Sequence, residues 1–523
     1  MIEEVFEDLV DQFSDPFTFY RELIQNAMDA GSNQVEVSVE YDTERRAVAI
    51  AVADAGQGMD REIIQNELTR LFSSSKENDL TKIGKFGIGF VSVFAIQPDI
   101  VLVDTGQGGE FWRVAFEGGT DYKCLRLREP VEGTTVRVYK NIKEEDFEEF
   151  RHRSLDTVRY WCRYSDTDIF FNGERINEGL DVDSPCRVFH RQPGTEIVVG
   201  YTSSTLPAVG MYNRGLTLKE ARQESLPGIT FRIKSRYLEH TLTRDNVLED
   251  DNYFKAMKIL AGVVREDLTE KLFGDCQACF PDTLANRERL NELMAAAGPV
   301  LRRWKTEFPK RFHDRALFPC VEGGARNIEE LRWAALKEGA VYVDSSSNHV
   351  TRVLHQFGIP VVRGEAGSAV ASALEAVTGY APRLARQSVA APVPLLRQIH
   401  QAEIAQISGP VIGMLRRGKT AVRRILLADF GYEGSSVKAR PCLAQFHDGE
   451  PVRLFERGFW RSLQKYPGLL LLNHEHSLVR KAIAQAENNP LLAAFVIAKA
   501  ALLQDGLPGD LEAKIVQRCV GMR

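Results

Sequence analysis

Apolar and polar residues follow one another with different periods along the first 140 residues. Apolar residues recur at helical spacing over residues 6–13 and, after Asp15-Pro16 interrupts the pattern, over residues 17–27, which predicts two helices. The period changes to two over residues 35–39 and 47–52, and a polar turn separates these stretches. This change of period predicts a β-hairpin directly after the second helix.

Further alternating segments extend the predicted sheet. They lie at residues 100–103, 111–116, 124–127 and 134–139. Helices combined with short alternating strands of this kind are typical of a layer of helices over a mainly antiparallel sheet. We therefore expect residues 1–140 to form a first domain with an α+β fold.

The second predicted part of the chain spans residues 141–285. It begins with an acidic helix at 144–150, contains strands such as 169–171 and 196–200, and ends in a helix at 253–273.

The third and fourth predicted parts span residues 286–390 and 391–523. In the third part, strands at 340–343 and 359–362 enclose a helix, a pattern of strand, crossover helix and strand. Two prolines and small residues at 387–394 indicate a linker. The fourth part mixes strands with two terminal helices, and an apolar stripe on the first of them suggests a dimerisation surface. These helices span 490–503 and 511–520, and the stripe consists of Leu491, Leu492, Phe495 and Val496.

Composition and charge narrow the class of protein. With 523 residues, 44% of them hydrophobic and 26% charged, the chain can form several ordinary globular cores. A net charge of −6 argues against nucleic-acid binding through overall charge. The acidic N-terminus does not look like a secretory signal, and the apolar stretches are shorter than the ~20 residues of a membrane span. We expect a cytoplasmic protein without membrane contact.

Eight cysteines are scattered along the chain. The close pair, Cys276 and Cys279, has no second pair or spaced histidines that would complete a tetrahedral zinc site. Reduced and mostly buried thiols are the interpretation that we prefer to metal or redox chemistry.

The second predicted helix carries the first candidate motif. Glu22, Asn26 and Asp29 are spaced so that they project from one face of this helix. A solvated helix face is the ordinary interpretation of such a stripe. However, a carboxylate and an amide one turn apart also suit a Mg²⁺ ion and an attacking water molecule.

Two further motifs are rich in glycine. Asp54-Ala55-Gly56-Gln57-Gly58-Met59 directly follows a predicted strand, where the aspartate could accept a hydrogen bond from an exocyclic amine and the glycines leave room for a planar ligand. An ordinary Asp/Gly turn is the alternative. The second, Gly84-Lys85-Phe86-Gly87-Ile88-Gly89-Phe90, opens a predicted helix and could offer N–H groups to phosphates, although such a loop alone is weak support. A fourth motif, Gly133-Thr134, could place a hydroxyl beside the aspartate.

Together, the four motifs resemble in order and spacing the nucleotide site of the GHKL ATPase superfamily. Within it they are most similar to the heat-shock protein 90 chaperones of the bacterial HtpG type. The sequence F-Y-R-E-L-I-Q-N-A at 19–27 looks like the F-L-R-E-L-I-S-N-A of these chaperones, and residues 83–90 look like their I-G-Q-F-G-V-G-F. The resemblance implies an N-terminal GHKL (Bergerat) ATPase α/β sandwich, followed by α/β middle domains, the first ribosomal S5 domain 2-like, and a mixed C-terminal domain.

The resemblance also implies roles for residues. Glu22 would be the general base, Asn26 the Mg²⁺ ligand, Asp54 the adenine acceptor, Met59 an apolar wall, and Thr134 a second adenine contact. Further ATP contacts are implied for Asp29, Ala30, Gly58, Gly84, Lys85, Phe86, Gly87, Ile88, Gly89 and Phe90. Residues 66–84 would form a mobile lid, in which Ser73-Ser74-Ser75-Lys76 replaces the S-G-T-K of the family, so that we expect lid kinetics to differ.

Two later segments resemble the same chaperones. Residues 210–246 are similar to part of their middle domain, which implies that Arg244 reaches the γ-phosphate, whereas an exposed loop salt bridge is the alternative. Leu248 stands where the family has a glutamine that contacts this phosphate. Residues 472–479 resemble the C-terminal L-N-x-x-H-P-L-V, and because His474-Glu475-His476 has the wrong spacing for an H-E-x-x-H zinc helix, we interpret it as structural.

The leading hypothesis is an ATP-dependent chaperone that uses Mg²⁺, acts on unfolded or metastable client proteins and forms a homodimer. The alternative is a GHKL ATPase switch in nucleic-acid transactions or defence, without general chaperone activity. A histidine kinase is disfavoured because no helical hairpin with a phosphoacceptor histidine precedes the ATPase motifs. A pure scaffold would leave four motifs in family order without a ligand.

Overall fold

A computed structural model describes residues 10, 15–69, 87–117, 121–223, 226–241, 246–417, 422–455 and 468–503. The chain divides into two compact units. The first consists of Met1–Gly200 and Leu206–Val264, and the second of Tyr201–Thr205 and Arg265–Arg523. The finer division at residues 140, 285 and 390 stays a prediction.

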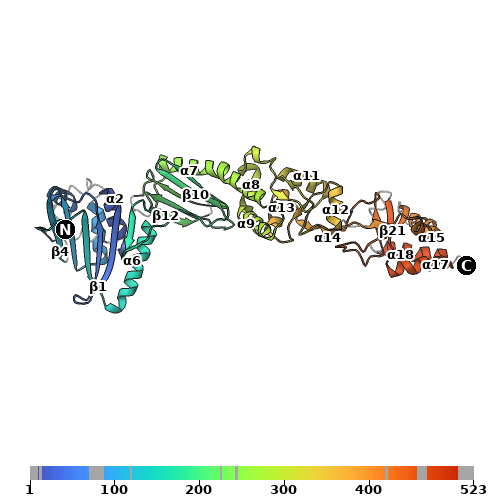
Figure 1. Cartoon of the computed structure of the whole chain (residues 1–523), viewed down its shortest axis with the longest axis horizontal. Helices are drawn as coiled ribbons and strands as arrows, with labels where there is room; N and C mark the ends of the chain where they lie inside the picture. The colour runs from blue at the N-terminus through green and yellow to red at the C-terminus, as the bar shows by residue number, and fades with distance from the viewer. Residues whose placement is uncertain are drawn as a thin grey trace. The chain divides into compact units, whose positions relative to one another are not determined.

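The first unit begins with a sheet of eight strands, in the order β5-β4-β3-β6-β2-β1-β7-β8. Strands β1 and β4 of this sheet are labelled in Figure 1. Neighbouring strands are antiparallel, except that β1 and β7 run parallel. The strands are β1 (Gln34–Asp42), β2 (Ala47–Asp54), β3 (Ile100–Gln107), β4 (Glu110–Glu117), β5 (Tyr122–Arg126), β6 (Thr134–Asn141), β7 (Asp168–Phe171) and β8 (Glu174–Arg175). The predicted hairpin is therefore present as β1 and β2, and the α+β fold class is confirmed.

Helices cover one face of this sheet, because apolar residues alternate along its strands and their side chains therefore share that face. Val35, Val37 and Val39 of β1 are buried, whereas the residues between them are exposed or half-buried. The longer helices α2 (Phe19–Asp29) and α6 (Phe147–Cys162) join the same core, and the Tyr20 hydroxyl lies 3.0 Å from the Ser154 hydroxyl. Short helical segments complete this layer: η1 (Pro16–Thr18), α3 (Arg61–Ile63), η2 (Ile64–Leu68), α5 (Gly87–Val91), η4 (Ser92–Ile96) and η5 (Glu144–Asp146).

The strand predicted at 169–171 is present and belongs to this first sheet, although it falls in the second predicted part of the chain. Strand β7 pairs with β1, with Ile169 opposite Val35 and Phe171 opposite Val37. Helix α6 forms the connection that brings β7 to the free edge of β1. An alternating apolar pattern predicts a strand but does not say which strand it pairs with, since pairing depends on residues far away in sequence.

A second sheet in the first unit has five strands in the order β12-β11-β13-β10-β9. Strands β11 and β13 are parallel and joined through β12, and the other described pairs are antiparallel. The strands are β9 (Arg187–Gln192), β10 (Thr195–Tyr201), β11 (Ala208–Asn213), β12 (Leu216–Arg222) and β13 (Ile229–Ser235). Helix α7 (Asp251–Val263) follows, and the Asp250 side chain caps its first turn. The π-helix η6 (Val264–Leu268) continues it.

The second unit begins with helices and a small parallel sheet. Strand β16 (Val341–Asp344) pairs in parallel with β17 (Val361–Arg363) and with β18 (Pro382–Leu384). The predicted pattern of strand, helix and strand is confirmed, since α12 (His349–Gln356) connects β16 to β17. The other elements here are α8 (Thr269–Ala278), α9 (Leu284–Leu301), α10 (Trp304–Glu307), η7 (Lys310–Phe312), β14 (Phe318–Pro319), β15 (Ala325–Arg326), α11 (Ile328–Glu338) and α13 (Ala369–Thr378).

The segment 387–394 is packed, and the prediction of a linker there was wrong. It contains the end of α14 (Ala385–Ser388) and two short strands, β19 (Val389–Ala390) and β20 (Val393–Pro394). Val389 and Ala390 are fully buried. Strand β19 pairs with β23 (Val452–Arg453). Small residues and prolines also suit short strands at a sheet edge, and only distant partners decide between the two structures.

The last part of the second unit is a four-stranded sheet with helices. Its order is β20-β21-β24-β22, with β21 (Val422–Asp429), β22 (Cys442–Gln445) and β24 (Gly468–Asn473). Helices α15 (Gln398–Arg417), α17 (Ser477–Ala486) and α18 (Pro490–Leu503) share one apolar core with it. The predicted helix at 490–503 is thus present, whereas the one at 511–520 lies outside the described residues. Leu491 and Leu492 are about half exposed, at 49% and 46%.

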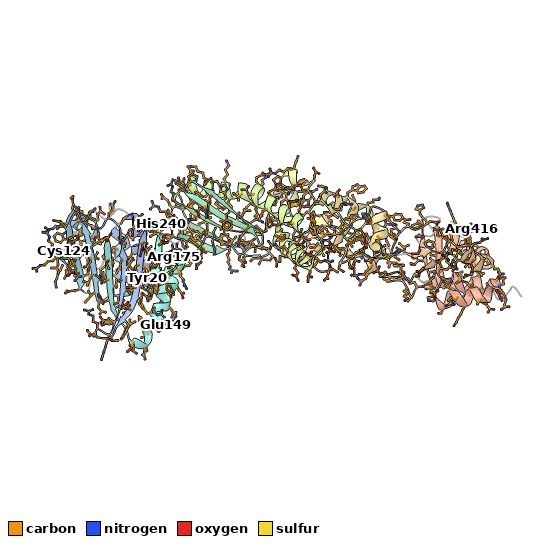
Figure 2. The ribbon with its side chains drawn as sticks, viewed as in Figure 1. Tyr20, Cys124, Glu149, Arg175, His240 and Arg416 are labelled. Carbon is orange, nitrogen blue, oxygen red and sulfur yellow. The ribbon has the colours of Figure 1, made fainter. Side chains whose placement is uncertain are left out.

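Two further features concern the whole described chain. No helix among the described residues is long and apolar enough to cross a membrane. The described cysteines form no disulfide, and most are buried, whereas Cys124 on β5 is exposed. Figure 2 shows Cys124 at the outer edge of the first sheet, away from Tyr20 of α2.

Candidate nucleotide site

Three polar side chains lie in a row across the first sheet. In the strand register, Asp54 of β2 is opposite Thr134 of β6, and Thr134 is opposite Thr105 of β3. Two residues away in the same three strands lies a row of buried valines, Val52, Val136 and Val103. Side chains two residues apart in a strand share a face, so these three polar groups end the apolar face on which α2 lies.

The Asp54 carboxyl group is oriented by backbone groups. Its Oδ1 accepts a hydrogen bond from the Gly56 N–H at 2.8 Å. Burial raises the pKa of this carboxyl group, and the N–H groups of Gly56 and Thr134 oppose part of that effect. A half-buried carboxylate beside a hydroxyl is a suitable acceptor for an exocyclic amine of a planar base.

Thr105 is a member of the site that sequence reasoning missed. Its side chain is fully buried, and its Oγ1 accepts a hydrogen bond from the Met59 N–H at 2.9 Å. The same oxygen lies 3.2 Å from the Gly133 carbonyl and 2.9 Å from the Thr134 hydroxyl. The available signal was the continuation of the predicted strand 100–103, since β3 extends to Gln107 and places Thr105 opposite Thr134.

Helix α2 brings the first motif to this face of the sheet. Glu22 is 2% exposed, Asn26 is half-buried and Asp29 is exposed. The three residues therefore do not form a uniformly solvated stripe, because burial increases from Asp29 towards Glu22. A buried carboxyl group on a helix is uncommon without a structural or chemical partner.

The loop between β2 and α3 is held to the C-terminal end of α2. The Gln57 N–H donates to the Ala30 carbonyl at 3.0 Å, and the Ala55 N–H donates to the Ser32 hydroxyl at 3.1 Å. A Cβ on Gly56 would lie 2.8 Å from the Ala30 Cβ, so only glycine allows this approach. The predicted contact residue Ala30 thus lies beside the loop that carries Asp54.

Gly58 and Gly133 hold the loop against the strands. Gly58 has φ +69°, and a Cβ there would lie 2.0 Å from the Gly106 carbonyl oxygen. Gly133 has φ +62°, and a Cβ would lie 2.0 Å from the Asp54 carbonyl oxygen. Met59 follows Gly58 and packs against the hydrophobic core. The glycines therefore set the position of Asp54 and Met59 relative to the row of polar side chains.

Asp29 also contacts the second sheet of the first unit. Its Oδ1 lies 3.5 Å from the Arg214 guanidinium, in the turn between β11 and β12. Arg214 has φ +46°, and a Cβ on the neighbouring Gly215 would lie 1.9 Å from the Tyr164 carbonyl oxygen. The segment 210–216, which resembles the chaperone middle domain, therefore packs closely on the first sheet and its helices.

The predicted phosphate loop is described only in part. Gly84, Lys85, Phe86 and residues 73–76 of the predicted lid lie outside the described residues. Gly87 and Ile88 begin α5, which contacts α2, and the Gly89 carbonyl accepts the Ser92 hydroxyl at 2.5 Å. The Phe90 ring is buried against Phe94 and Phe116, so only its backbone could meet a ligand.

The predicted γ-phosphate contact, Arg244, also lies outside the described residues. The residues on either side of its loop are described, and His240 and Val247 form a β-bridge. Leu248, which stands four residues after Arg244, is 42% exposed.

Comparison with known proteins gives this part of the chain a class. Residues 18–116 match the family described as histidine kinase-, DNA gyrase B-, and HSP90-like ATPase. This range contains α2, the Asp54 loop and two members of the polar row, Asp54 and Thr105, whereas Thr134 lies beyond it. The first unit therefore contains a GHKL ATPase domain, which is a domain of nucleotide-binding type.

Curated relatives point to one branch of that class. The chain is 30% identical over 176 residues to the chaperone protein HtpG of Klebsiella pneumoniae, and 32% identical over 177 residues to that of Sodalis glossinidius. Each match covers 27% of this chain, and 28% and 27% of the two relatives respectively. The chain thus spans just over a quarter of the length of the relatives that it matches. Through this region it is similar to HtpG chaperones.

Proposed function

We propose that the protein is an ATP-dependent molecular chaperone of the heat-shock protein 90 type. The observation that carries the proposal is the row formed by Asp54, Thr134 and Thr105, which faces a helix with a buried glutamate, Glu22. Glu22, Asp54 and Thr105 lie within residues 18–116, the range that matches histidine kinase-, DNA gyrase B-, and HSP90-like ATPases, and Thr134, beyond this range, lies opposite Asp54 and Thr105. The similarity to HtpG chaperones supports the chaperone part of the proposal.

The adenine base would bind at the polar row. Asp54 would accept a hydrogen bond from the exocyclic amine, and the Thr134 hydroxyl would complete this contact. Met59 would form an apolar wall, because its position is held by the Thr105 hydroxyl through the Met59 N–H. The close backbone approach at Gly58 and Gly133 would fix the positions of Asp54 and Met59 on either side of the base.

Hydrolysis would take place at the helix. Glu22 would orient or activate the attacking water, and its burial suits a general base whose surroundings exclude bulk solvent. Asn26, one turn later, would hold Mg²⁺, which neutralises phosphate charge when it is bound. Residues 84–90 would bind phosphates and Arg244 would stabilise charge on the γ-phosphate. Asp29 and Ala30 would line the same site.

The partners of the protein follow from the same proposal. Clients would be unfolded or metastable proteins, and a homodimer in the cytoplasm would be the working form. The alternative is a GHKL ATPase switch in nucleic-acid transactions or defence. It stays open because the matches to HtpG chaperones cover only about a quarter of the chain. Both functions would use the same nucleotide site.

The nucleotide site is tested with two variants. Asp54→Asn should abolish ATP binding, since the amide presents donors to the base amine, whereas Asp121→Asn, at an exposed carboxylate of the same domain, should not change it. Glu22→Ala should abolish turnover and leave ATP binding largely intact. Isothermal titration and a phosphate-release assay measure both quantities. Unchanged ATP affinity in Asp54→Asn would show that the site is misassigned.

The chaperone proposal is tested separately. An unfolded client should change the ATPase rate of the wild type, and the protein should suppress client aggregation in an ATP-dependent way. Stimulation by DNA, with no effect of any client, would instead support the switch. Glu22→Ala should lack ATP turnover under both hypotheses, so its rate serves as the background value in both assays.

A further inference from the structure

Three potential metal ligands come together in the second unit, far in sequence from the nucleotide site. His400, Glu403 and His474 each offer one ligand atom, and these atoms lie within 4.8 Å of one another. His400 Nδ1 is 3.4 Å from Glu403 Oε1, and His474 Nε2 is 3.6 Å from Glu403 Oε2. Two atoms bound at ~2.0–2.1 Å to a tetrahedral Zn²⁺ ion are about 3.4 Å apart, so both separations fit an ion between the side chains.

Two ordered elements present these ligands. His400 and Glu403 lie in the first turns of α15, three residues apart and hence on one helix face. Arg416, labelled in Figure 2, lies near the other end of this helix. His474 directly follows β24, and its backbone N–H donates to the Ala428 carbonyl of β21 at 3.1 Å. The ligands therefore come from a helix and a strand that share one core.

The residue before His474 holds its loop in place. Asn473 is 2% exposed, and its side-chain amide donates to the carbonyl groups of Lys438 and Arg440, both at 2.9 Å. Its Oδ1 accepts the Glu475 N–H at 3.2 Å. A preorganised ligand loop lowers the entropy cost of binding an ion.

Glu475 gives the second, independent observation. Its Oε1 lies 3.2 Å from Nδ1 of His474, the ring nitrogen that faces away from Glu403. A histidine that binds a metal through one nitrogen commonly donates its other N–H to a carboxylate, which fixes the tautomer. With Nδ1 beside Glu475, Nε2 is the ring nitrogen that lies towards Glu403. Glu475 also lies 3.7 Å from Arg480.

His400 has the complementary feature. Its Nδ1 is buried and makes no hydrogen bond to any described residue, although Glu403 Oε1 lies 3.4 Å away. A bound ion would satisfy this nitrogen, because neutral imidazole presents a lone pair to a metal. The neighbouring His476 has another role, since its side chain accepts the Leu478 N–H and caps α17.

We propose that His400, Glu403 and His474 bind one divalent transition-metal ion, with Zn²⁺ as the representative ion and Glu475 as the carboxylate that orients His474. Two imidazole nitrogens and one carboxylate group form a donor set for such ions, and water would fill the remaining position. The ion would link the start of α15 to the end of β24. The site is independent of the proposed nucleotide chemistry.

The test uses the full-length protein after removal of metal with a chelator. Equilibrium dialysis against Zn²⁺, followed by metal analysis, should find one more bound ion in the wild type than in His400→Ala or His474→Ala. Zinc held by cysteines is common to all variants and cancels in this difference. His447→Ala, at an exposed histidine of the same part of the chain, should behave as the wild type.

Graded effects and stability give further readouts. Removal of a ligand by Glu403→Gln should weaken Zn²⁺ binding by more than ~100-fold, and Glu475→Gln by about tenfold, since it keeps all three ligands. Zn²⁺ should raise the thermal unfolding midpoint of the wild type and of His447→Ala, but not that of the ligand variants. Circular dichroism without metal shows whether each variant folds. Equal Zn²⁺ stoichiometry and affinity in the wild type and in folded His474→Ala and Glu403→Gln would overturn the proposal.

Discussion

At the scale of single residues, the candidate nucleotide site depends on glycines that differ in what surrounds them. Gly31 and Gly58 both have positive φ, at +81° and +69°. A Cβ on Gly31 would meet no atom within 4 Å, whereas a Cβ on Gly58 would lie 2.0 Å from the Gly106 carbonyl oxygen. Substitution of Gly31 therefore adds backbone strain alone, whereas substitution of Gly58 adds backbone strain and steric overlap.

Gly31→Ala should lower the free energy of unfolding by ~1 kcal/mol, the cost of a side chain in the left-handed region. Gly58→Ala should lower it by a further ~2 kcal/mol, because the new methyl group forces the loop away from β3. It should also weaken ATP binding, whereas Gly31→Ala should leave ATP affinity unchanged. Urea unfolding and titration with ATP measure these effects. Equal losses of stability in the two variants would contradict the close approach.

At the scale of elements, one carboxylate joins three strands of the first sheet. Asp104 of β3 accepts hydrogen bonds from Arg113 of β4 at 2.6 and 2.8 Å and from Arg137 of β6 at 2.5 Å. Asp104 is 5% exposed and lies on the face of the sheet opposite to the polar row, since it precedes Thr105. Burial alone would raise the pKa of Asp104, but the two guanidinium groups outweigh it, and the pKa is lower than usual.

This pKa predicts how stability depends on pH. A carboxyl group whose pKa is lower in the folded than in the unfolded state stabilises the fold above its unfolded value of about 3.9, and this contribution is lost as the pH falls. Asp104→Asn should therefore lower the free energy of unfolding by about 2 kcal/mol at pH 7 and by much less near pH 3. Urea unfolding at several pH values measures the difference. A difference that stays constant from pH 7 to pH 3 would argue against the pairing.

At the scale of the whole molecule, the first sheet extends past the predicted boundary at residue 140. Helix α6 and strand β7 contribute Val158, Cys162 and Ile169 to its core, all fully buried. A fully buried Val or Ile side chain contributes about 1.5–3 kcal/mol. A fragment that ends at residue 140 would expose the apolar surface that these residues cover.

A fragment of residues 1–178 should therefore fold cooperatively and bind ATP, whereas a fragment of residues 1–140 should not. The longer fragment contains β8, which ends the sheet at Arg175. Thermal unfolding followed by circular dichroism, together with ATP titration, compares the two. If the 1–140 fragment unfolds cooperatively at the same temperature as the longer one, α6 and β7 are not needed for this domain.

Sequence by itself determined the local features of this protein. Residue period predicted α2, the hairpin of β1 and β2 and the strands up to β6, because each depends on neighbours within a few residues. The motif around Asp54 and the helix with Glu22 were identified from residue types and their order. The α+β class and the relation to HSP90-like ATPases followed from these local signals.

Tertiary structure decided what depends on distant partners. Only the strand register places Thr105 beside Thr134, and only packing shows that Glu22 is buried while Asp29 is exposed. The pairing of β7 with β1 and the packing of residues 387–394 likewise depend on residues far away in sequence. The approach of His400 to His474 belongs to the same class, since a local pattern cannot predict a contact made across 74 positions of the chain. The physical reason is that period reports which face of an element is apolar, whereas register and pairing are set by the complete fold.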